Sequence, residues 1–333
     1  MNIDSIFSVT ADDFEEKALA VFAYQFAHVP FYQTYCKLMH KQPGNVRTIN
    51  DIPFLPIEFF KTQQIIAEGK QAQAIFESST TTGTIPSKHF VADLSMYETS
   101  FLKGFEAAYG NPKDFLFLAL LPSYLERGNS SLVYMANQLI ALSEHQESGF
   151  ILHDFEQLKN TLQATKVPRE KIILLGVTYA LLDFAEQFPM DLNGITIMET
   201  GGMKGRRAEM TRMEIHRELS TAFCVGAIHS EYGMTELLSQ AYSKENGIFK
   251  AAPWMKVLTR DMYDPGSYVT HQSGGINIID LANLYSCAFI ATSDVGKVFP
   301  DGTFEVIGRM ETADIRGCNL MYDSFGEHSS TKP

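Results

Sequence analysis

The stretch KIILLGVTYALLDFAEQ at residues 171–187 decides the fold. Its first part, Lys171–Leu175, is a short apolar run, and a helix-like segment follows near Tyr179–Gln187. Apolar runs without alternating polar residues are typical of strands that are buried on both faces, and a following helix fits the crossover between two parallel strands. The stretch therefore predicts a βαβ unit of a largely parallel sheet.

The same pattern occurs on both sides of this unit. Phe115–Leu121 precedes a predicted helix near Ser130–Leu142, and Ile195–Met198 precedes one near Arg207–Leu219. Repeated alternation of short apolar runs with helices favours the α/β class. We therefore expect an α/β core over residues 51–245.

The two ends of the chain differ from this core. Apolar residues such as Phe14, Ala18 and Phe22 have helical spacing up to Pro30, which predicts a helical arm over residues 1–50. After Glu245, Gly, Asp and Pro turns separate short runs, which predicts a β-rich antiparallel subdomain over residues 246–320 that could form a barrel. Its expected strands are Trp254–Leu258, Tyr268–His271, Gly275–Asp280, Phe289–Thr292 and Thr303–Ile307. Residues 321–333 resemble a loose tail.

Charge and cysteine usage exclude several classes of protein. The net charge of −12 disfavours nucleic acid and anionic membranes as partners, so any nucleotide site must be compact. We identify no secretory signal and no apolar run approaching the ~20 residues of a membrane span. Cysteines stand far apart at Cys36, Cys224, Cys287 and Cys318, which indicates neither a zinc ribbon nor a disulfide framework. A cytoplasmic protein with reduced thiols is expected.

The first candidate site is ESSTTTGTIPSK at residues 77–88. Hydroxyls and backbone N–H groups in a turn around Gly83 could bind phosphate oxygens, and Lys88 would supply positive charge. A flexible Ser/Thr linker would have the same composition. The hydroxyl side chains of the segment are those of Ser78, Ser79, Thr80, Thr81, Thr82, Thr84 and Ser87.

The second candidate is SEYGMTE at residues 230–236, between a strand-like Ala222–Ile228 and a possible helix. Ligands bind at the carboxyl ends of strands in open α/β sheets. Thr235 offers a hydroxyl to a phosphate and Glu236 a carboxylate to Mg²⁺, while Tyr232, before Gly233, could stack on a base. The alternative is an ordinary turn in which Thr235 or Glu236 serves the start of a helix.

Three further segments could contact a nucleotide. Gly201 and Gly202 follow a predicted strand and would let the backbone approach a flat base. Asp294 could accept both ribose hydroxyls, and Arg309 could reach ribose or phosphate. Each also has a simple structural explanation. The glycines could form a plain turn, Asp294 could bond its own backbone, and Arg309 could be an ordinary surface cation.

In this order, the segments resemble the motifs of the adenylate-forming superfamily of acyl-CoA synthetases, peptide-synthetase adenylation domains and luciferases. PSK at 86–88 is similar to the end of the superfamily's phosphate loop, YGMTE at 232–236 to its Tyr-Gly-x-Thr-Glu motif, and GR at 308–309 to the start of its hinge. IPFLPIEFFK at 52–61 and residues 230–240 are similar to LuxE-type acyl-protein synthetases. The resemblance covers residues 50 to 320 approximately.

The resemblance implies the large N-terminal domain of that superfamily and activation of a carboxylic acid, expected to be a fatty acid, by ATP and Mg²⁺. It assigns phosphate contacts to Ser79, Thr81, Thr82, Lys88 and Thr235, and Mg²⁺ to Glu236. It assigns the ribose to Asp294 and Arg309, and the adenine to Gly201 and Gly202. It also implies that Cys318 accepts the acyl group, although a buried core cysteine is the alternative; the other three cysteines are expected in the core.

Two departures leave alternatives open. Thr80 stands where the superfamily usually has glycine, and the sequence stops soon after residues 308–319, without a counterpart of the mobile C-terminal domain and its catalytic lysine. An acyl-protein synthetase acting with an acyl-accepting reductase is the first hypothesis. An acid ligase that delivers the acyl group to coenzyme A or a carrier protein is the second, and a non-catalytic scaffold subunit is the third.

Overall fold

The computed structural model describes residues 3–79, 85–122, 129–152, 154–201 and 210–310. The described α-helices are α1 (Ile3–Phe7), α2 (Phe14–His28), α3 (Pro30–Leu38), α4 (Leu94–Tyr109), α6 (Ser131–Leu142), α7 (Phe155–Ala164), α8 (Thr178–Gln187) and α9 (Arg212–Phe223). The 3₁₀ turns are η1 (Ile49–Asp51), η2 (Ile57–Lys61), η3 (Pro112–Asp114) and η4 (Arg169–Lys171).

Most of the strands belong to one large sheet with the order β11-β12-β13-β14-β10-β9-β8-β7-β6-β4-β5, and β1 pairs with β13 off this path. These strands are β1 (Leu55–Pro56), β4 (Leu116–Leu120), β5 (Gly149–Ile151), β6 (Ile172–Val177), β7 (Thr196–Thr200), β8 (His229–Tyr232), β9 (Ala241–Ser243), β10 (Ile248–Ala251), β11 (Met255–Arg260), β12 (Gly274–Asp280), β13 (Phe289–Val298) and β14 (Phe304–Arg309). A separate hairpin consists of β2 (Ala74–Glu77) and β3 (Lys88–Val91).

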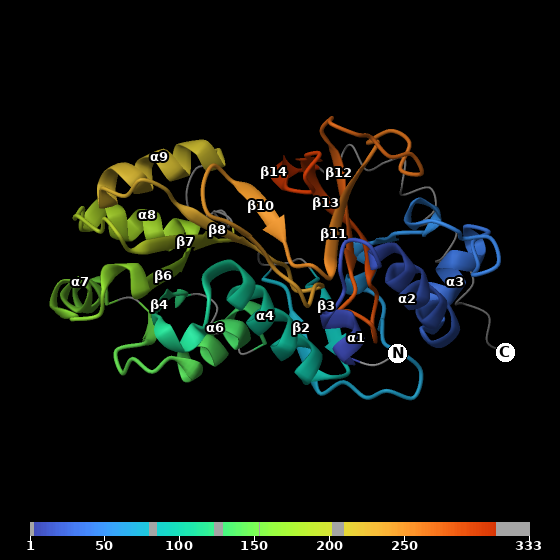
Figure 1. Cartoon of the computed structure of the whole chain (residues 1–333), viewed down its shortest axis with the longest axis horizontal. Coiled ribbons are helices and arrows are strands. Elements are labelled where there is room, and N and C mark those ends of the chain that lie inside the picture. Colours follow the sequence, from blue (N-terminus) through green and yellow to red (C-terminus); the bar gives the residue numbers. More distant parts are fainter. Residues whose placement is uncertain (1–2, 80–84, 123–128, 153, 202–209, 311–333) are drawn as a thin grey trace.

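The parallel half of the sheet runs from β5 through β4, β6 and β7 to β8. Every residue of β4 and β6 is buried, as expected for strands covered on both faces. Figure 1 shows α8 and α9 on one face of these strands and α4 and α6 on the other. The predicted α/β fold class is confirmed.

A glycine allows α8 to pack closely on β6. A Cβ at Gly176 would lie 2.7 Å from Cγ of Leu181 and 3.3 Å from Cβ of Leu120, closer than packed side chains approach one another. β6 ends at Val177 and α8 begins at the next residue, Thr178. The missing side chain at Gly176 gives Leu181 of α8 room beside the strand.

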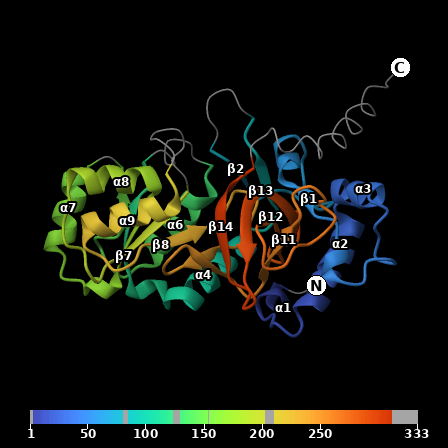
Figure 2. The ribbon, with the colours of Figure 1, turned by 90° about the horizontal axis from the view of Figure 1, so that it is seen from above.

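The helical arm packs on the antiparallel half of the sheet, as both views show (Figure 1, Figure 2). Tyr32 of α3 stacks on Phe289 of β13, with ring centroids 6.0 Å apart. Gln25 of α2 is fully buried and donates to the carbonyls of Asn283 and Leu284 while it accepts from the amide of Ala288. A loop on the sheet thus has its backbone groups satisfied by a helix from the other end of the sequence.

Four expectations about local structure were wrong. Residues 268–271 do not form a strand, because Tyr268 makes only an isolated bridge to Arg260. The strand expected at 222–228 lies later, since α9 continues to Phe223 and β8 begins at His229, and residues 233–240 form turns rather than a helix. In the described strand order β11 and β5 are the two ends, so the β-rich part continues an open sheet and does not close into a barrel.

Candidate active site

The hydroxyl of Tyr232, at the end of β8, joins strands from both halves of the sheet. It donates a hydrogen bond of 2.8 Å to Oδ2 of Asp294 on β13, and Nε of Arg309 on β14 lies 3.2 Å from Oδ1 of the same carboxylate. Asp294 and Arg309 are direct neighbours across the β13–β14 ladder. Tyr232 and Asp294 are buried, whereas the side chain of Arg309 is 82% exposed. The structure thus brings together residues from three separate motifs.

Aromatic packing fixes the Tyr232 ring. Its centroid lies 5.7 Å from that of Phe249 and 5.6 Å from that of Phe304. Burial raises the pKa of Tyr232 well above its usual value, and the nearby charge of Asp294 raises it further. The phenol therefore stays protonated and acts as the donor to the carboxylate.

The hydroxyl-rich segment is the connection of the β2–β3 hairpin, and Glu77 pairs with Lys88 at its base. Nζ of Lys88 lies 3.2 Å from Oε1 of Glu77, with both side chains about one-third to one-half exposed (34% and 46%). Oγ of Ser78 accepts a hydrogen bond from the amide of Ser87, which closes the base of the loop. Ser79 is exposed. Thr80, Thr81, Thr82, Gly83 and Thr84 lie outside the described residues.

Glu236 lies at the meeting point of these segments. The residue is 5% exposed, and its carboxyl receives a hydrogen bond from Ser87 at the end of the hairpin loop. Burial raises its pKa, while the charge of Arg309 lowers it and that of Asp294 raises it, so all three side chains lie within electrostatic range. The hairpin, the β8 turn and the β13–β14 pair therefore form one cluster.

The donor set around Glu236 fits Mg²⁺ shared with phosphate oxygens rather than a protein cage. Among the described residues, no group of three or more His, Cys, Asp or Glu side chains is arranged to hold a metal ion. Mg²⁺ bound through one carboxylate, with phosphates and water as the other ligands, is a common arrangement in nucleotide sites. Glu236 is suited to be that carboxylate.

Three buried residues without a role in the sequence analysis fix the turn that carries Thr235 and Glu236. Nδ1 of His89 contacts the carbonyl oxygen of Thr235 at 2.8 Å, and Asn283 donates to the carbonyl oxygen of Glu236 at 2.8 Å. Asp280 accepts from the amides of Leu238 and Ser239. Burial lowers the pKa of His89 to about 4 and raises that of Asp280 to about 6.

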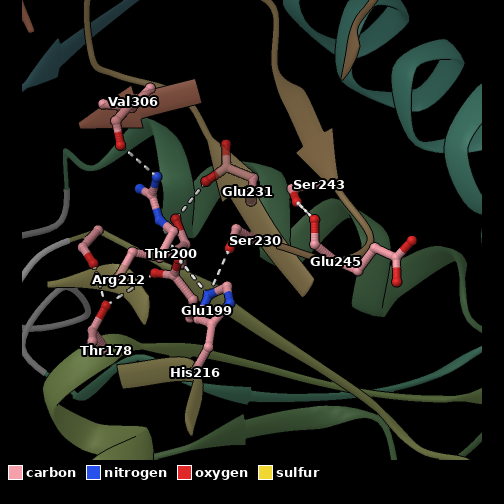
Figure 3. A network of polar contacts seen from close by, with 11 residues as sticks. Thr178, Glu199, Thr200, Arg212, His216, Ser230, Glu231, Ser243, Glu245 and Val306 are labelled. Carbon is pink, nitrogen blue, oxygen red and sulfur yellow. Dashed lines mark hydrogen bonds and ion pairs between the residues drawn. The ribbon is translucent and has the colours of Figure 1, made fainter. Parts of the chain in front are cut away.

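A second network of buried charge surrounds Glu199 on β7 (Figure 3). Its carboxylate lies 3.3 Å from Nε of Arg212 and 3.6 Å from Nε2 of His216, both on α9. Burial alone would raise the pKa of Glu199, but the bond from His216 and the charge of Arg212 outweigh it and the pKa is lowered. Arg212 also donates to the carbonyl of Val306 on β14, at 2.9 Å. The helix is thereby tied to both halves of the sheet.

The same network positions the strand end that precedes the glycine pair. The hydroxyl of Thr178 donates to Glu199 at 3.1 Å and to the carbonyl of Gly201. Gly201 has a φ of +71°, a conformation that glycine adopts without strain. Gly202 lies outside the described residues.

Glu231 on β8 is the other buried carboxyl of this region. Thr200 on β7 donates a short hydrogen bond to its Oε2. Burial raises the pKa of Glu231 to about 7, and the charge of Glu199 acts in the same direction. A Cβ at Gly233 would lie 2.4 Å from Oε1 of Glu231, so a side chain at this position of the motif would displace the Glu231 carboxyl. The polar sequence HSEY of β8 does not predict a buried strand, so no signal in the sequence identified Glu231.

The cysteines divide into three groups. Cys36 and Cys287 are buried as expected, and burial raises the pKa of the Cys36 thiol to about 12 and that of Cys287 further. Cys224 is exposed in the left-handed residue that follows α9, so its expected place in the core was wrong. Cys318 lies outside the described residues.

Two solved structures illustrate the fold of this chain. A 2-hydroxyisobutyryl-CoA ligase in complex with 2-HIB-AMP and CoA is 13% identical, with a TM-score of 0.67 over 93% of this chain and 71% of that chain. ATP-bound MatB from Rhodopseudomonas palustris is 17% identical, with a TM-score of 0.55 over 73% of this chain and 49% of that chain. This chain thus spans about half the length of MatB. The fold is that of the large N-terminal domain of adenylate-forming enzymes.

A family model for LuxE acyl-protein synthetases matches residues 10–325, and the chain belongs to this family. No curated protein matches the chain. Across the described residues, no helix has the length and apolar character needed to cross a membrane.

Proposed function

We propose that the protein uses MgATP to activate a carboxylic acid as an acyl-adenylate and then transfers the acyl group to a protein thiol. The observation that carries this proposal is the cluster of Tyr232, Asp294, Arg309 and Glu236, which come from three motifs. Tyr232 and Arg309 contact Asp294 directly, and the charges of Asp294 and Arg309 act on Glu236. A carboxylate–arginine pair beside a second, Mg²⁺-competent carboxylate suits a ribose and a phosphate chain on one ligand.

In the first step a carboxylate oxygen of the acid attacks the α-phosphorus of ATP, and the bond to pyrophosphate breaks. Catalysis of such a transfer consists mainly of positioning and of stabilising charge on the phosphate oxygens. Bound Mg²⁺ would supply positive charge to those oxygens at Glu236. Asp294 and Arg309 would bind the ribose, and Thr235 and the hydroxyls of the 78–84 loop would bind the departing phosphates.

Lys88 is able to bind the departing phosphates because its ion pair with Glu77 is weak. Exposed ion pairs such as Lys88–Glu77 contribute about 1 kcal/mol or less, so exchange of Glu77 for a phosphate costs little. Pyrophosphate carries more negative charge than one carboxylate. Lys88 would therefore turn toward the nucleotide when it binds.

In the second step a thiolate sulfur attacks the acyl carbon, a thioester forms and AMP leaves. Cys318 is the proposed nucleophile, and Arg316 close to it in sequence would favour the thiolate. The family description, an acyl-protein synthetase, supports a protein acceptor. A fatty acid as the acyl source and a reductase as the final acceptor are parts of the same proposal.

The test is incubation of the protein with MgATP and labelled acids, followed by pyrophosphate release and covalent label. We expect release with a suitable acid and a hydroxylamine-sensitive label that Cys318→Ser removes. Cys224→Ser is the matched control, because Cys224 is an exposed thiol at the C-terminal end of α9. If Cys318→Ser still releases pyrophosphate and transfers the acyl group only to added coenzyme A or carrier protein, the acceptor is coenzyme A or the carrier and not the enzyme thiol. Absence of MgATP binding in calorimetry would favour the scaffold hypothesis.

A further inference from the structure

Helix α2 carries a polar side chain on the face that it buries against the sheet. In α2, which is described throughout, Gln25 is the one polar residue of that face, and the other buried residues are Phe14, Ala18, Val21 and Phe22. A buried polar side chain needs hydrogen-bond partners to replace water, whereas an apolar side chain of similar size does not. The glutamine therefore indicates a specific contact and not packing alone.

The contact of Gln25 is with the loop between β12 and β13. Gln25 donates to the carbonyl oxygens of Asn283 and Leu284 at 2.8 and 3.0 Å, and it accepts from the amide of Ala288 at 3.0 Å. The first of these bonds joins residues 258 positions apart in the sequence. One side chain of the helical arm thus fixes this loop at three backbone groups.

Asn283 continues the chain of contacts to the turn of the nucleotide site. Its Nδ2 donates to the carbonyl oxygen of Glu236 at 2.8 Å, so its Oδ1 faces Nε2 of His89, at 3.0 Å. Nδ1 of the same histidine contacts the carbonyl oxygen of Thr235 at 2.8 Å. The residue whose backbone Gln25 holds is therefore also the residue whose side chain holds the turn, directly at Glu236 and through His89 at Thr235.

Every link of this chain is buried. Gln25 is 0% exposed, His89 and Asn283 are 1% exposed, and Glu236 is 5% exposed. Hydrogen bonds in such places are not replaced by bonds to water, and a closely packed interior transmits a displacement. A shift of the loop would therefore move the backbone of Glu236 and redirect its carboxyl. A misplacement of about 1 Å in an active site can cost about a hundredfold in rate.

We propose that Gln25 is a positioning residue of the nucleotide site, which holds Asn283 and through Asn283 sets the position of Glu236. The inference rests on the proposed function, in which Glu236 shares Mg²⁺ with the phosphates of ATP. The helical arm then supports the active site from behind and is more than a cover of the sheet.

The test is a double-mutant cycle on MgATP binding, measured by calorimetry with the wild type, Gln25→Met, Asn283→Leu and the double variant. Each replacement nearly keeps the size of the side chain and removes its donors. We expect each single variant to lower the affinity by about tenfold, as loss of one buried hydrogen bond predicts. The double variant should also lose about tenfold and not about a hundredfold, because Gln25 acts through Asn283.

Two controls separate positioning from a general loss of structure. Gln33→Met is the matched control, because Gln33 of α3 donates to the carbonyl of Phe26 inside the arm, at 2.8 Å, and the variant should bind MgATP as the wild type does. If Gln25 served only stability, its variant would show fewer binding sites of unchanged affinity, and this result overturns the proposal. Gln25→Glu repeats the test if Gln25→Met does not fold, since it keeps the acceptor for Ala288 and loses the donors to Asn283 and Leu284.

ATP–pyrophosphate exchange separates this inference from the function on which it rests. Wild-type affinity in the folded Gln25 variants, with normal exchange, overturns the positioning role and leaves acid activation intact. A hundredfold loss in the double variant overturns the transmission through Asn283. The expected losses of affinity without exchange for any acid support the positioning role and overturn acid activation. Absence of MgATP binding by the wild type overturns both.

Discussion

Replacement of Glu231 by glutamine is expected to stabilise the protein at pH 8 and to leave its stability at pH 5 nearly unchanged. The carboxyl is 8% exposed, and Thr200 donates to it. Burial raises its pKa to about 7 in the folded protein, whereas the unfolded chain has an ordinary value of 4.5. The folded state therefore holds the proton more tightly than the unfolded state does.

The sign and size of the effect follow from this difference. A raised carboxyl pKa gives stability that is fully present below about pH 4.5 and is lost as the pH rises through about 7. At about 1.4 kcal/mol per pH unit, the wild type loses about 3 kcal/mol from this group by pH 8. Glutamine has nearly the same shape and does not ionise, so the variant avoids that loss.

The assay is urea unfolding of wild type and Glu231→Gln between pH 5 and pH 8, followed by the fluorescence of Trp254, the single tryptophan. The difference in free energy of unfolding should grow by about 3 kcal/mol across this range. Asp280, whose pKa is also raised, is present in both proteins, so its contribution cancels. A difference that stays constant with pH would show that Glu231 is already ionised in a satisfied environment and would refute the reasoning.

Three further predictions concern contacts of the described structure. Arg212→Met should lower the free energy of unfolding by about 3 kcal/mol in urea titrations, because it leaves buried Glu199 with His216 as its remaining basic partner. A loss below about 0.5 kcal/mol, as for an ordinary surface substitution, would contradict the network. Gly296→Ala should cost about 1–3 kcal/mol because its Cβ would lie 2.2 Å from the carbonyl oxygen of Glu305, whereas Gly149→Ala, with open space around it, should change little. Tyr232→Phe should weaken MgATP binding in calorimetry by about tenfold, since Asp294 loses its buried donor, and unchanged affinity would place the nucleotide elsewhere.

The parallel core could be predicted because its strands are continuous apolar runs. Phe115–Leu121 contains all of β4, and Lys171–Leu175 contains four of the six residues of β6. Such runs are read from the sequence without knowledge of any partner. The order of the motifs indicated the superfamily, and the stretches at 52–61 and 230–240 indicated the LuxE family, which the family model confirms.

The position of β8 could not be predicted in the same way. Its sequence, HSEY, is polar, and the apolar run before it belongs to the end of α9 and a loop. These side chains are buried because distant residues satisfy them: His216 contacts Ser230, Thr200 contacts Glu231, and Asp294 contacts Tyr232. Tertiary partners override local composition here.

The residues that hold the Thr235–Glu236 turn were missed for the same reason. His89 and Asn283 reach it from positions 146 and 47 residues away along the chain. The sequence around a lone histidine in a strand does not indicate which carbonyl the histidine will contact. Only the packing of β3 and of the loop after β12 against the turn makes their role visible.

Oxygen-18 transfer tests the central claim most directly. The acid is labelled in its carboxylate and incubated with the protein, MgATP and an acceptor thiol, and the released AMP and pyrophosphate are analysed by mass spectrometry. Formation of an acyl-adenylate predicts one labelled oxygen in AMP and none in pyrophosphate, and loss of this labelled AMP in Asp294→Ala. Label in inorganic phosphate with release of ADP would indicate an acyl phosphate and contradict the account.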